Sequence, residues 1–160
     1  MVYESSVEIA PVSYEGKSIL RNLMELCQHD YSEFDGADVA EHGVLGYKYL
    51  DNYWTEEARQ PFFMRVNGRL AGFALVRDIG DVHTMAEFFI VRKYRRLGLG
   101  RTVAHRLFDM LPGKWRVEQE PGNLPAQAFW RRIIGEYTHG RYEELAGDDH
   151  WDGPFQLFES

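Results

Sequence analysis

The segment from Arg95 to Arg101 combines the residue types of an anion-binding site. It reads Arg95-Arg96-Leu97-Gly98-Leu99-Gly100-Arg101 and follows the apolar run Phe88-Phe89-Ile90-Val91. Backbone N–H groups at the start of a helix have no acceptor within the helix, and the helix dipole adds partial positive charge there. Glycines let a phosphate group approach these N–H groups, and arginines add charge. The segment therefore predicts a phosphate-bearing ligand at a helix N-terminus.

Two other phosphate-binding motifs fit this segment poorly. No Gly-Lys-Ser/Thr follows the glycines, as a P-loop requires, and Val103 stands where a dinucleotide fingerprint needs a third glycine. A structural alternative stays open, in which the glycines serve helix packing and the arginines serve solubility.

The same residues resemble the acetyl-CoA signature of the GNAT superfamily of N-acetyltransferases, Arg/Gln-x-x-Gly-x-Gly/Ala. A second segment, Asn123-Leu124-Pro125-Ala126-Gln127-Ala128-Phe129-Trp130, is similar to the later Asn-x-x-Ala-x-x-Phe-Tyr segment of that family. The similarity covers about residues 60–145 well and the rest only through the order of elements. It implies an α/β chain with the GNAT acyl-CoA N-acyltransferase fold, a central mixed, mostly antiparallel sheet flanked by about four helices, and one N-acetyltransferase domain over residues 1–160.

The resemblance also implies an activity, which is direct transfer of an acetyl group from acetyl-CoA to a primary amine of a small molecule or peptide. The amides from about Arg96 to Arg101 would hold the pyrophosphate, the main chain of Phe88 and Ile90 would pair with the pantetheine amides, and Asn123 would contact the pantetheine arm or nearby backbone. The expected cofactor-binding residues are Phe88, Phe89, Ile90, Arg95, Arg96, Leu97, Gly98, Leu99, Gly100, Arg101, Asn123 and Trp130.

The catalytic residues are harder to assign. Many relatives use a tyrosine as the acid where this chain has Trp130, whose indole is no acid, so we expect Tyr137 to substitute, with Tyr142 as an alternative. Glu87 is the expected base, directly or through water, because burial beside Phe88 would raise its pKa toward neutrality. The alternatives for Glu87 are a solvated surface carboxylate or a binder of cationic substrate, and His83 is a weaker candidate base.

Trp130 also keeps a second function open, a catalytically silent GNAT domain that binds acyl-CoA as a sensor or interaction module. A nucleotide-binding regulator is a third alternative. The histidines show no spacing typical of a metal site, so no metal is expected.

Composition limits the partners. The 160 residues carry a net charge of −7, which disfavours nucleic acid, and one cysteine, Cys27, which suits a reducing, cytoplasmic setting and a buried position in a helix. No leader or membrane-spanning stretch is recognisable, and the resemblance allows a homodimer. Five acids and no Lys or Arg lie between Asp30 and Glu41. This run is either a solvated surface or, if it lines the acceptor side, an attraction for a cationic amine such as a polyamine, an aminoglycoside or a lysine-bearing peptide.

The surrounding pattern predicts the elements that position these residues. The expected strands are Val7–Val12, Phe62–Val66, Leu70–Val76, Val82–Val91, Trp115–Glu118, Tyr137–Leu145 and Pro154–Phe158. The expected helices are one after Ser13 that fades near Tyr31, one over Gly98–Leu111, one capped by Asn123, and a short one within Tyr47–Trp54. Asn67-Gly68 predicts a type I′ hairpin turn.

Overall fold

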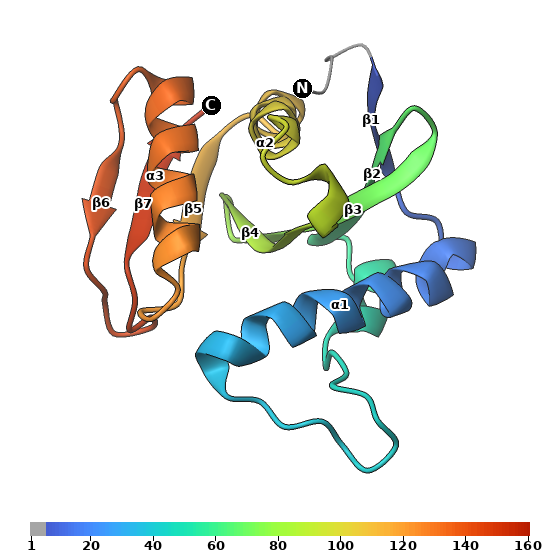
Figure 1. Ribbon diagram of the computed structural model, residues 1–160. Coiled ribbons are helices and arrows are strands. Elements are labelled where there is room, and N and C mark those ends of the chain that lie inside the picture. Colours follow the sequence, from blue (N-terminus) through green and yellow to red (C-terminus); the bar gives the residue numbers. More distant parts are fainter. Residues whose placement is uncertain (1–5) are drawn as a thin grey trace.

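The computed structural model describes residues 6–160 and contains one seven-stranded sheet of order β1-β2-β3-β4-β5-β7-β6 (Figure 1). The strands are β1 (Val7–Pro11), β2 (Arg59–Val66), β3 (Arg69–Ile79), β4 (Val82–Ile90), β5 (Lys114–Glu118), β6 (Glu143–Leu145) and β7 (Phe155–Glu159). The helices are α1 (Lys17–Asp35), α2 (Leu99–Met110) and α3 (Leu124–Thr138), with short 3-10 helices η2 (Tyr14–Gly16), η3 (Leu50–Trp54) and η4 (Arg92–Tyr94). The mixed, mostly antiparallel α/β fold is therefore confirmed.

The predicted hairpin is confirmed at Asn67 and Gly68. Both residues have positive φ angles, 50° and 78°, as a type I′ turn requires. The turn joins β2 to β3 in antiparallel register, with Val66 opposite Arg69. This hairpin lies in the centre of the half-sheet β1–β4.

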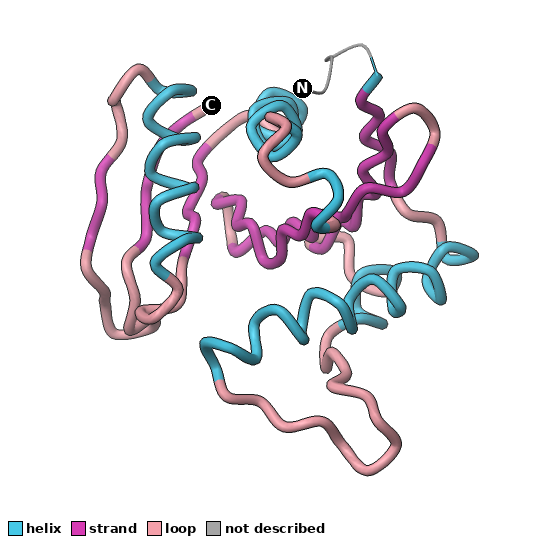
Figure 2. The backbone as a smooth tube through the Cα atoms, viewed as in Figure 1, coloured by secondary structure: helices cyan, strands magenta, loops and turns pink. Residues whose placement is uncertain are grey.

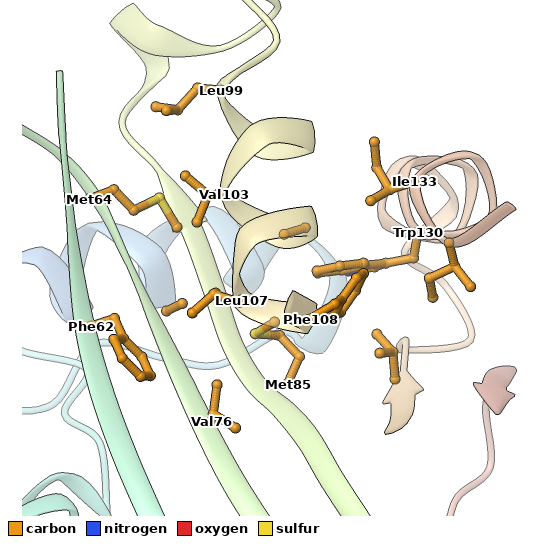
Figure 3. Close-up of a cluster of buried hydrophobic side chains, with 14 of the residues drawn as sticks. Phe62, Met64, Val76, Met85, Leu99, Val103, Leu107, Phe108, Trp130 and Ile133 are labelled. Atoms are coloured by element: carbon orange, nitrogen blue, oxygen red, sulfur yellow. The ribbon is translucent and has the colours of Figure 1, made fainter. Parts of the chain in front are cut away.

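The sheet separates two apolar layers. On one face, α2 and α3 pack on the sheet through the core cluster that Figure 3 shows, in which Val103, Leu107 and Phe108 of α2 meet Trp130 and Ile133 of α3. On the other face, α1 and η3 cover residues of β2, β3 and β4 in a second cluster (Figure 1). Each residue of a strand faces the layer opposite to its neighbour's, so β4 contributes to both layers.

The parallel pair β4–β5 is short, and the sheet opens there. The two strands are paired only from Val82 to Thr84 and from Lys114 to Arg116. The register of β4 with β3 also shifts, because Leu75 faces Glu87 while Val76 faces Met85, which leaves Ala86 as the extra residue of a β-bulge. Bulges bend a strand and re-aim its side chains. The bulge therefore sets Glu87 at the point where β4 leaves β5.

Several predicted boundaries differ from the structure. α1 continues past Tyr31 to Asp35 and ends at Gly36, which has a φ of 70°. Residues 137–138 belong to α3 rather than to a strand, because the apolar face of α3 stays packed through Ile134, and the strand after it is only Glu143–Leu145. Within the predicted apolar face of α1, Ile19 is 41% and Leu26 is 52% exposed.

Candidate functional site

The loop before α2 contains main-chain N–H groups that have no hydrogen-bond acceptor within the part of the protein that the structure describes. Gly98 caps the helix with φ 83° and ψ 2°, and Arg96 also has a positive φ of 62°. The N–H of Thr102 donates to the Gly98 carbonyl at 3.1 Å, whereas among residues 6–160 the N–H groups from Arg96 to Arg101 meet no acceptor. A side chain at Gly98 would point into open space. This cradle of free donors fits a pyrophosphate group.

The side of Gly100 that a Cβ atom would occupy faces neighbouring elements of the protein. Gly100 is buried in α2, and a Cβ atom there would lie 2.9 Å from the ring of Phe129 and 3.0 Å from Cδ1 of Ile90. The missing side chain therefore lets α2 approach α3 and β4. The alternative interpretation of this glycine as a packing residue is supported, while Gly98 shapes the loop.

The arginines of the loop are not equally free. Arg95 donates through Nε to the Ile90 carbonyl at 2.7 Å and through a terminal nitrogen to Asp30 at 2.5 Å, and Arg92 contacts the same carboxylate at 3.0 Å. These pairs hold the pKa of Asp30 below its usual range, against the opposing effect of burial. Arg101 pairs with Glu136 at 2.7 Å. Part of the predicted acidic run is thus joined to the basic loop, and Arg96 has no ion-pair partner among residues 6–160.

The open edge of β4 carries the main chain of Phe88 and Ile90. The Phe88 carbonyl accepts a hydrogen bond from the Tyr31 hydroxyl at 3.4 Å, and the Ile90 carbonyl accepts from Arg95, so neither faces β3. The N–H and C=O of one residue point to the same side of a strand. Both residues therefore offer donors on the edge that β5 leaves free, whereas the Phe89 side chain is buried against the α1 layer.

Glu87 lies in a cleft of about 420 Å³ between the diverging strands. Burial raises the pKa of its carboxyl group to about 8, hydrogen bonding from Tyr47 and from Cys27 opposes this, and the charges of Glu120 and Asp35 add to it. The Cys27 thiol lies 3.9 Å from Glu87 Oε2. A carboxyl group that ionises near neutral pH suits a general base.

The same cleft brings several predicted residues together. It is lined by Phe88, Asn123 and Trp130 as well as Glu87. Asn123 caps α3 by accepting the N–H of Ala126 at 3.1 Å, so its side-chain oxygen is committed to the helix. Trp130 is 7% exposed, its ring centroid lies 5.0 Å from that of Phe88 in an edge-on contact, and Figure 3 shows its side chain directed from α3 into the core cluster.

Tyr137 stands apart from this cleft. Its hydroxyl donates to Asp109 at 2.7 Å and its ring packs on His105 and Phe108. Burial and the neighbouring Asp109 raise the pKa of Tyr137 to about 12. It lines a different cavity, of about 1100 Å³, between α3, β5 and β7, together with the alternative acid Tyr142. The structure therefore does not bring either tyrosine to Glu87.

The remaining predicted residues lie outside the Glu87 cleft. Leu99 is buried in the α2 layer and Leu97 is half-buried beside it. His83 contacts Asp78 at 2.5 Å and the Pro112 carbonyl at 3.1 Å, and it is absent from the residues lining the cleft. Cys27 is buried, as predicted.

Three features of the site carried no recognisable sequence signal. These are the bulge at Ala86, the approach of Tyr47 to Glu87, and the convergence of Asp35 and Glu120 on the cleft. The residues involved come from segments that are far apart in the chain, so spacing alone does not bring them together.

Residues 6–160 contain neither a metal-binding cluster nor a membrane-spanning helix. These residues contain no group of three or more His, Cys, Asp or Glu side chains placed to hold a metal ion. Within the same range, no helix has both the length and the apolar character needed to cross a membrane.

Comparison with known proteins identifies the family. Residues 20–135 match the model of the acetyltransferase (GNAT) family. That range is well over half of the chain, so the protein belongs to the GNAT acetyltransferase family. No curated protein sequence matches the chain.

Solved structures confirm the fold. An acetyltransferase from Thermus thermophilus superposes with a TM-score of 0.72 at 15% identity, covering 97% of each chain. Spermidine N-acetyltransferase from Vibrio cholerae, crystallised with CoA and spermine, gives 0.63 at 12% identity over 97% of this chain and 96% of its own. The ribosomal-protein-S18-alanine N-acetyltransferase from Escherichia coli gives 0.63 at 16% identity over 96% and 93%. At these low sequence identities, the similarity shows a shared fold.

Proposed function

We propose that this protein transfers the acetyl group of acetyl-CoA directly to a primary amine of a small molecule or peptide. The observation that carries the proposal is the position of Glu87, a carboxyl group with a pKa of about 8, in the opening between β4 and β5. Beyond Glu87, the edge of β4 that faces away from β3 runs through Phe88 and Ile90 to the loop before α2. A base and a phosphate cradle are therefore joined by one exposed strand edge.

The chain's own residues fit the cofactor. The N–H groups of residues 96–101 would bind the pyrophosphate, and the open edge of β4 at Phe88 and Ile90 would pair with the extended pantetheine arm as a neighbouring strand does. When bound, acetyl-CoA would supply the activated thioester carbonyl that the amine attacks; the C–N bond forms, the C–S bond breaks, and CoA leaves as a thiolate that takes up a proton. Trp130 and Phe88 would exclude water from the end of the arm.

Glu87 would act on the acceptor. An amine is protonated in neutral solution and must lose a proton before it can attack a carbonyl carbon. The Glu87 carboxylate, once ionised, accepts that proton directly or through one water molecule. With a pKa near 8, both the protonated and the ionised form of Glu87 are populated near neutral pH, so the group can release the proton again after acetyl transfer.

The charges around the cleft favour a cationic acceptor. Asp35, at the end of α1, and Glu120, in the loop before α3, line the cleft, and their repulsion with Asp152 adds to burial in raising the pKa of Glu120. A positively charged ligand would relieve this repulsion. Two similar structures have names that specify amine acceptors, spermidine and the alanine of ribosomal protein S18, which agrees with a cationic amine here.

The test is steady-state release of CoA with acetyl-CoA and a panel of amines: spermidine, an aminoglycoside, a peptide with a free N-terminus and a lysine-bearing peptide. We expect saturable turnover with at least one of them, and kcat/KM that rises with pH as Glu87 ionises. Glu87→Gln should lower kcat while leaving the affinity for acetyl-CoA unchanged. Wild-type kcat in Glu87→Gln would remove the base from the mechanism.

A catalytically silent acyl-CoA-binding domain is the second candidate. Trp130 favours it, because it occupies the usual acid position with a core-packed side chain, and because the two tyrosines considered as substitutes line another cavity. Tight binding of acetyl-CoA without turnover on any amine of the panel would support this function instead.

A further inference from the structure

The Arg95 side chain links the end of β4 to α1. Figure 2 shows the chain between β4 and α2 as a short helical turn, η4, and a loop that leads into α2. The Nε atom of Arg95 donates to the Ile90 carbonyl at 2.7 Å, and a terminal nitrogen donates to Asp30 of α1 at 2.5 Å. The guanidinium carbon also lies 5.5 Å from the centre of the Phe89 ring. Three contacts therefore hold one guanidinium group against the end of the strand.

The Ile90 carbonyl lies on the side of β4 that faces away from β3. The next N–H along the chain, that of Val91, donates to the Ala71 carbonyl of β3 at 2.8 Å. Because neighbouring residues of an antiparallel strand direct their main-chain groups to opposite sides, Ile90 directs its N–H and its C=O to the open edge. The pantetheine arm is proposed to lie along this same edge.

A ligand that pairs with this edge as a strand does brings N–H donors as well as carbonyl acceptors. The Ile90 carbonyl already accepts from a cation, and a charge-assisted hydrogen bond is stronger than one between neutral groups. A carbonyl oxygen has two lone pairs, but a second donor gains less once a cation has drawn the electron density toward itself. An incoming amide N–H therefore competes with Arg95 at Ile90. At Phe88 the competition is weaker, since its carbonyl accepts from Tyr31 at 3.4 Å.

We propose that Arg95 acts as a strap across the open edge of β4, and that Asp30 anchors this strap. The pantetheine arm pairs fully with Ile90 only after the Arg95 side chain has left the carbonyl. Arg92 shares the Asp30 carboxylate, at 3.0 Å, but its side chain has no hydrogen bond to β4 among residues 6–160. This role rests on the acetyl-CoA site proposed above and adds that one of its own residues lowers its affinity.

S-acetylpantetheine is the probe that separates the strap from attraction of phosphate, because it has the pantetheine arm and no charge. Arg95→Met keeps an unbranched side chain beside Phe89 and removes the donors. We expect this variant to bind S-acetylpantetheine about fivefold more tightly than wild type, since the net value of one hydrogen bond corresponds to a factor of that size. The gain for acetyl-CoA should be smaller, because its phosphates lose a nearby cation.

Three further variants separate the strap from a general change in charge. Arg92→Met removes a cation from the same carboxylate without touching Ile90, so its affinity for S-acetylpantetheine should equal that of wild type. Asp30→Asn keeps the Arg95 side chain and weakens its anchor, so it should give a smaller gain than Arg95→Met. Glu33→Gln removes an exposed carboxylate from the same helix and should give none.

The Ile90 carbonyl can be followed directly by NMR, because Ile90-Val91 is the only Ile-Val pair in the sequence. Protein labelled with 13C at the isoleucine carbonyls and with 15N at valine gives a single correlation for this peptide bond. Without ligand, the signal of Arg92→Met should match wild type and that of Arg95→Met should differ, because the carbonyl has lost its donor. Titration with S-acetylpantetheine should reach its midpoint at a lower concentration in Arg95→Met than in wild type.

The outcomes separate the strap from the function on which it rests. If wild type binds acetyl-CoA and S-acetylpantetheine but Arg95→Met and Asp30→Asn bind S-acetylpantetheine no more tightly, the strap is overturned and the acetyl-CoA site stands. A gain in Arg95→Met alone would overturn the role of Asp30 as the anchor. If neither ligand binds to any of these proteins, the proposed function fails and the strap fails with it.

Discussion

The stability of the protein should depend on pH through Glu87, and replacing this residue with glutamine isolates the effect. The ordinary pKa of the group is 4.5, and burial raises it to about 8 in the folded protein. Between these values the folded protein keeps a proton on Glu87 that the unfolded chain has released. The folded state therefore binds more protons, so the free energy of unfolding falls as pH rises through this window. The amide introduced by Glu87→Gln carries no charge at any pH and removes this dependence.

The size of the effect follows from the two pKa values. At about 1.36 kcal/mol per pH unit, a rise from 4.5 to about 8 corresponds to at most about 5 kcal/mol at pH 9. Water entering the cleft reduces this figure, so we expect Glu87→Gln to be more stable than wild type by about 2–5 kcal/mol at pH 9. At pH 4.5 and below, both side chains are neutral in the folded protein and the two proteins should be nearly equal.

Urea unfolding measured at intervals from pH 4 to pH 9 tests this. Glu33→Gln is the control, because Glu33 is an exposed carboxylate on α1. The difference between Glu87→Gln and wild type should grow with pH, while Glu33→Gln should follow wild type. Parallel curves for wild type and Glu87→Gln would refute the raised pKa and, with it, the reason for assigning Glu87 as the base.

Three further predictions concern the loop and helices around the site. Gly100→Val should lower the free energy of unfolding by about 1–3 kcal/mol, measured in urea, because its side chain meets Phe129 and Ile90; unchanged stability would contradict the packing role. Asn123→Ala should lower the free energy of unfolding by about 1 kcal/mol because α3 loses its N-terminal cap. Unchanged stability in the same assay would contradict the capping role of Asn123. Arg96→Ala should weaken acetyl-CoA binding in low salt more than Arg92→Ala does, because Asp30 already pairs with Arg92; calorimetry showing equal losses would argue against this division.

Local sequence patterns predicted the elements whose signals are short in range. Asn67-Gly68 forms the expected hairpin because its positive φ angles depend on two adjacent residues. The start of α2 at its glycines and the capping of α3 by Asn123 were also predicted from neighbouring residues in the sequence. In each case the deciding interaction lies within a few residues of the chain.

The features that were missed depend on contacts between distant segments. The end of α1 was placed too early because its last turns are held by tertiary contacts, such as that between Asp30 and the loop of Arg92 and Arg95. The bulge at Ala86 follows from the register of β3 and β4. Tyr137, the expected acid, is not among the residues lining the Glu87 cleft, because α3 places its hydroxyl against Asp109 on α2.

The most direct measurement of the central claim is calorimetric titration of the purified protein with acetyl-CoA, desulfo-CoA and ATP as separate ligands. The free N–H groups before α2 and the open edge of β4 together predict micromolar binding of acetyl-CoA and desulfo-CoA, whose pantetheine arm can lie along β4, and much weaker binding of ATP, which lacks that arm. Equal affinity for ATP, or no binding of either CoA ligand, would contradict the assignment of this loop and strand edge as the acetyl-CoA site.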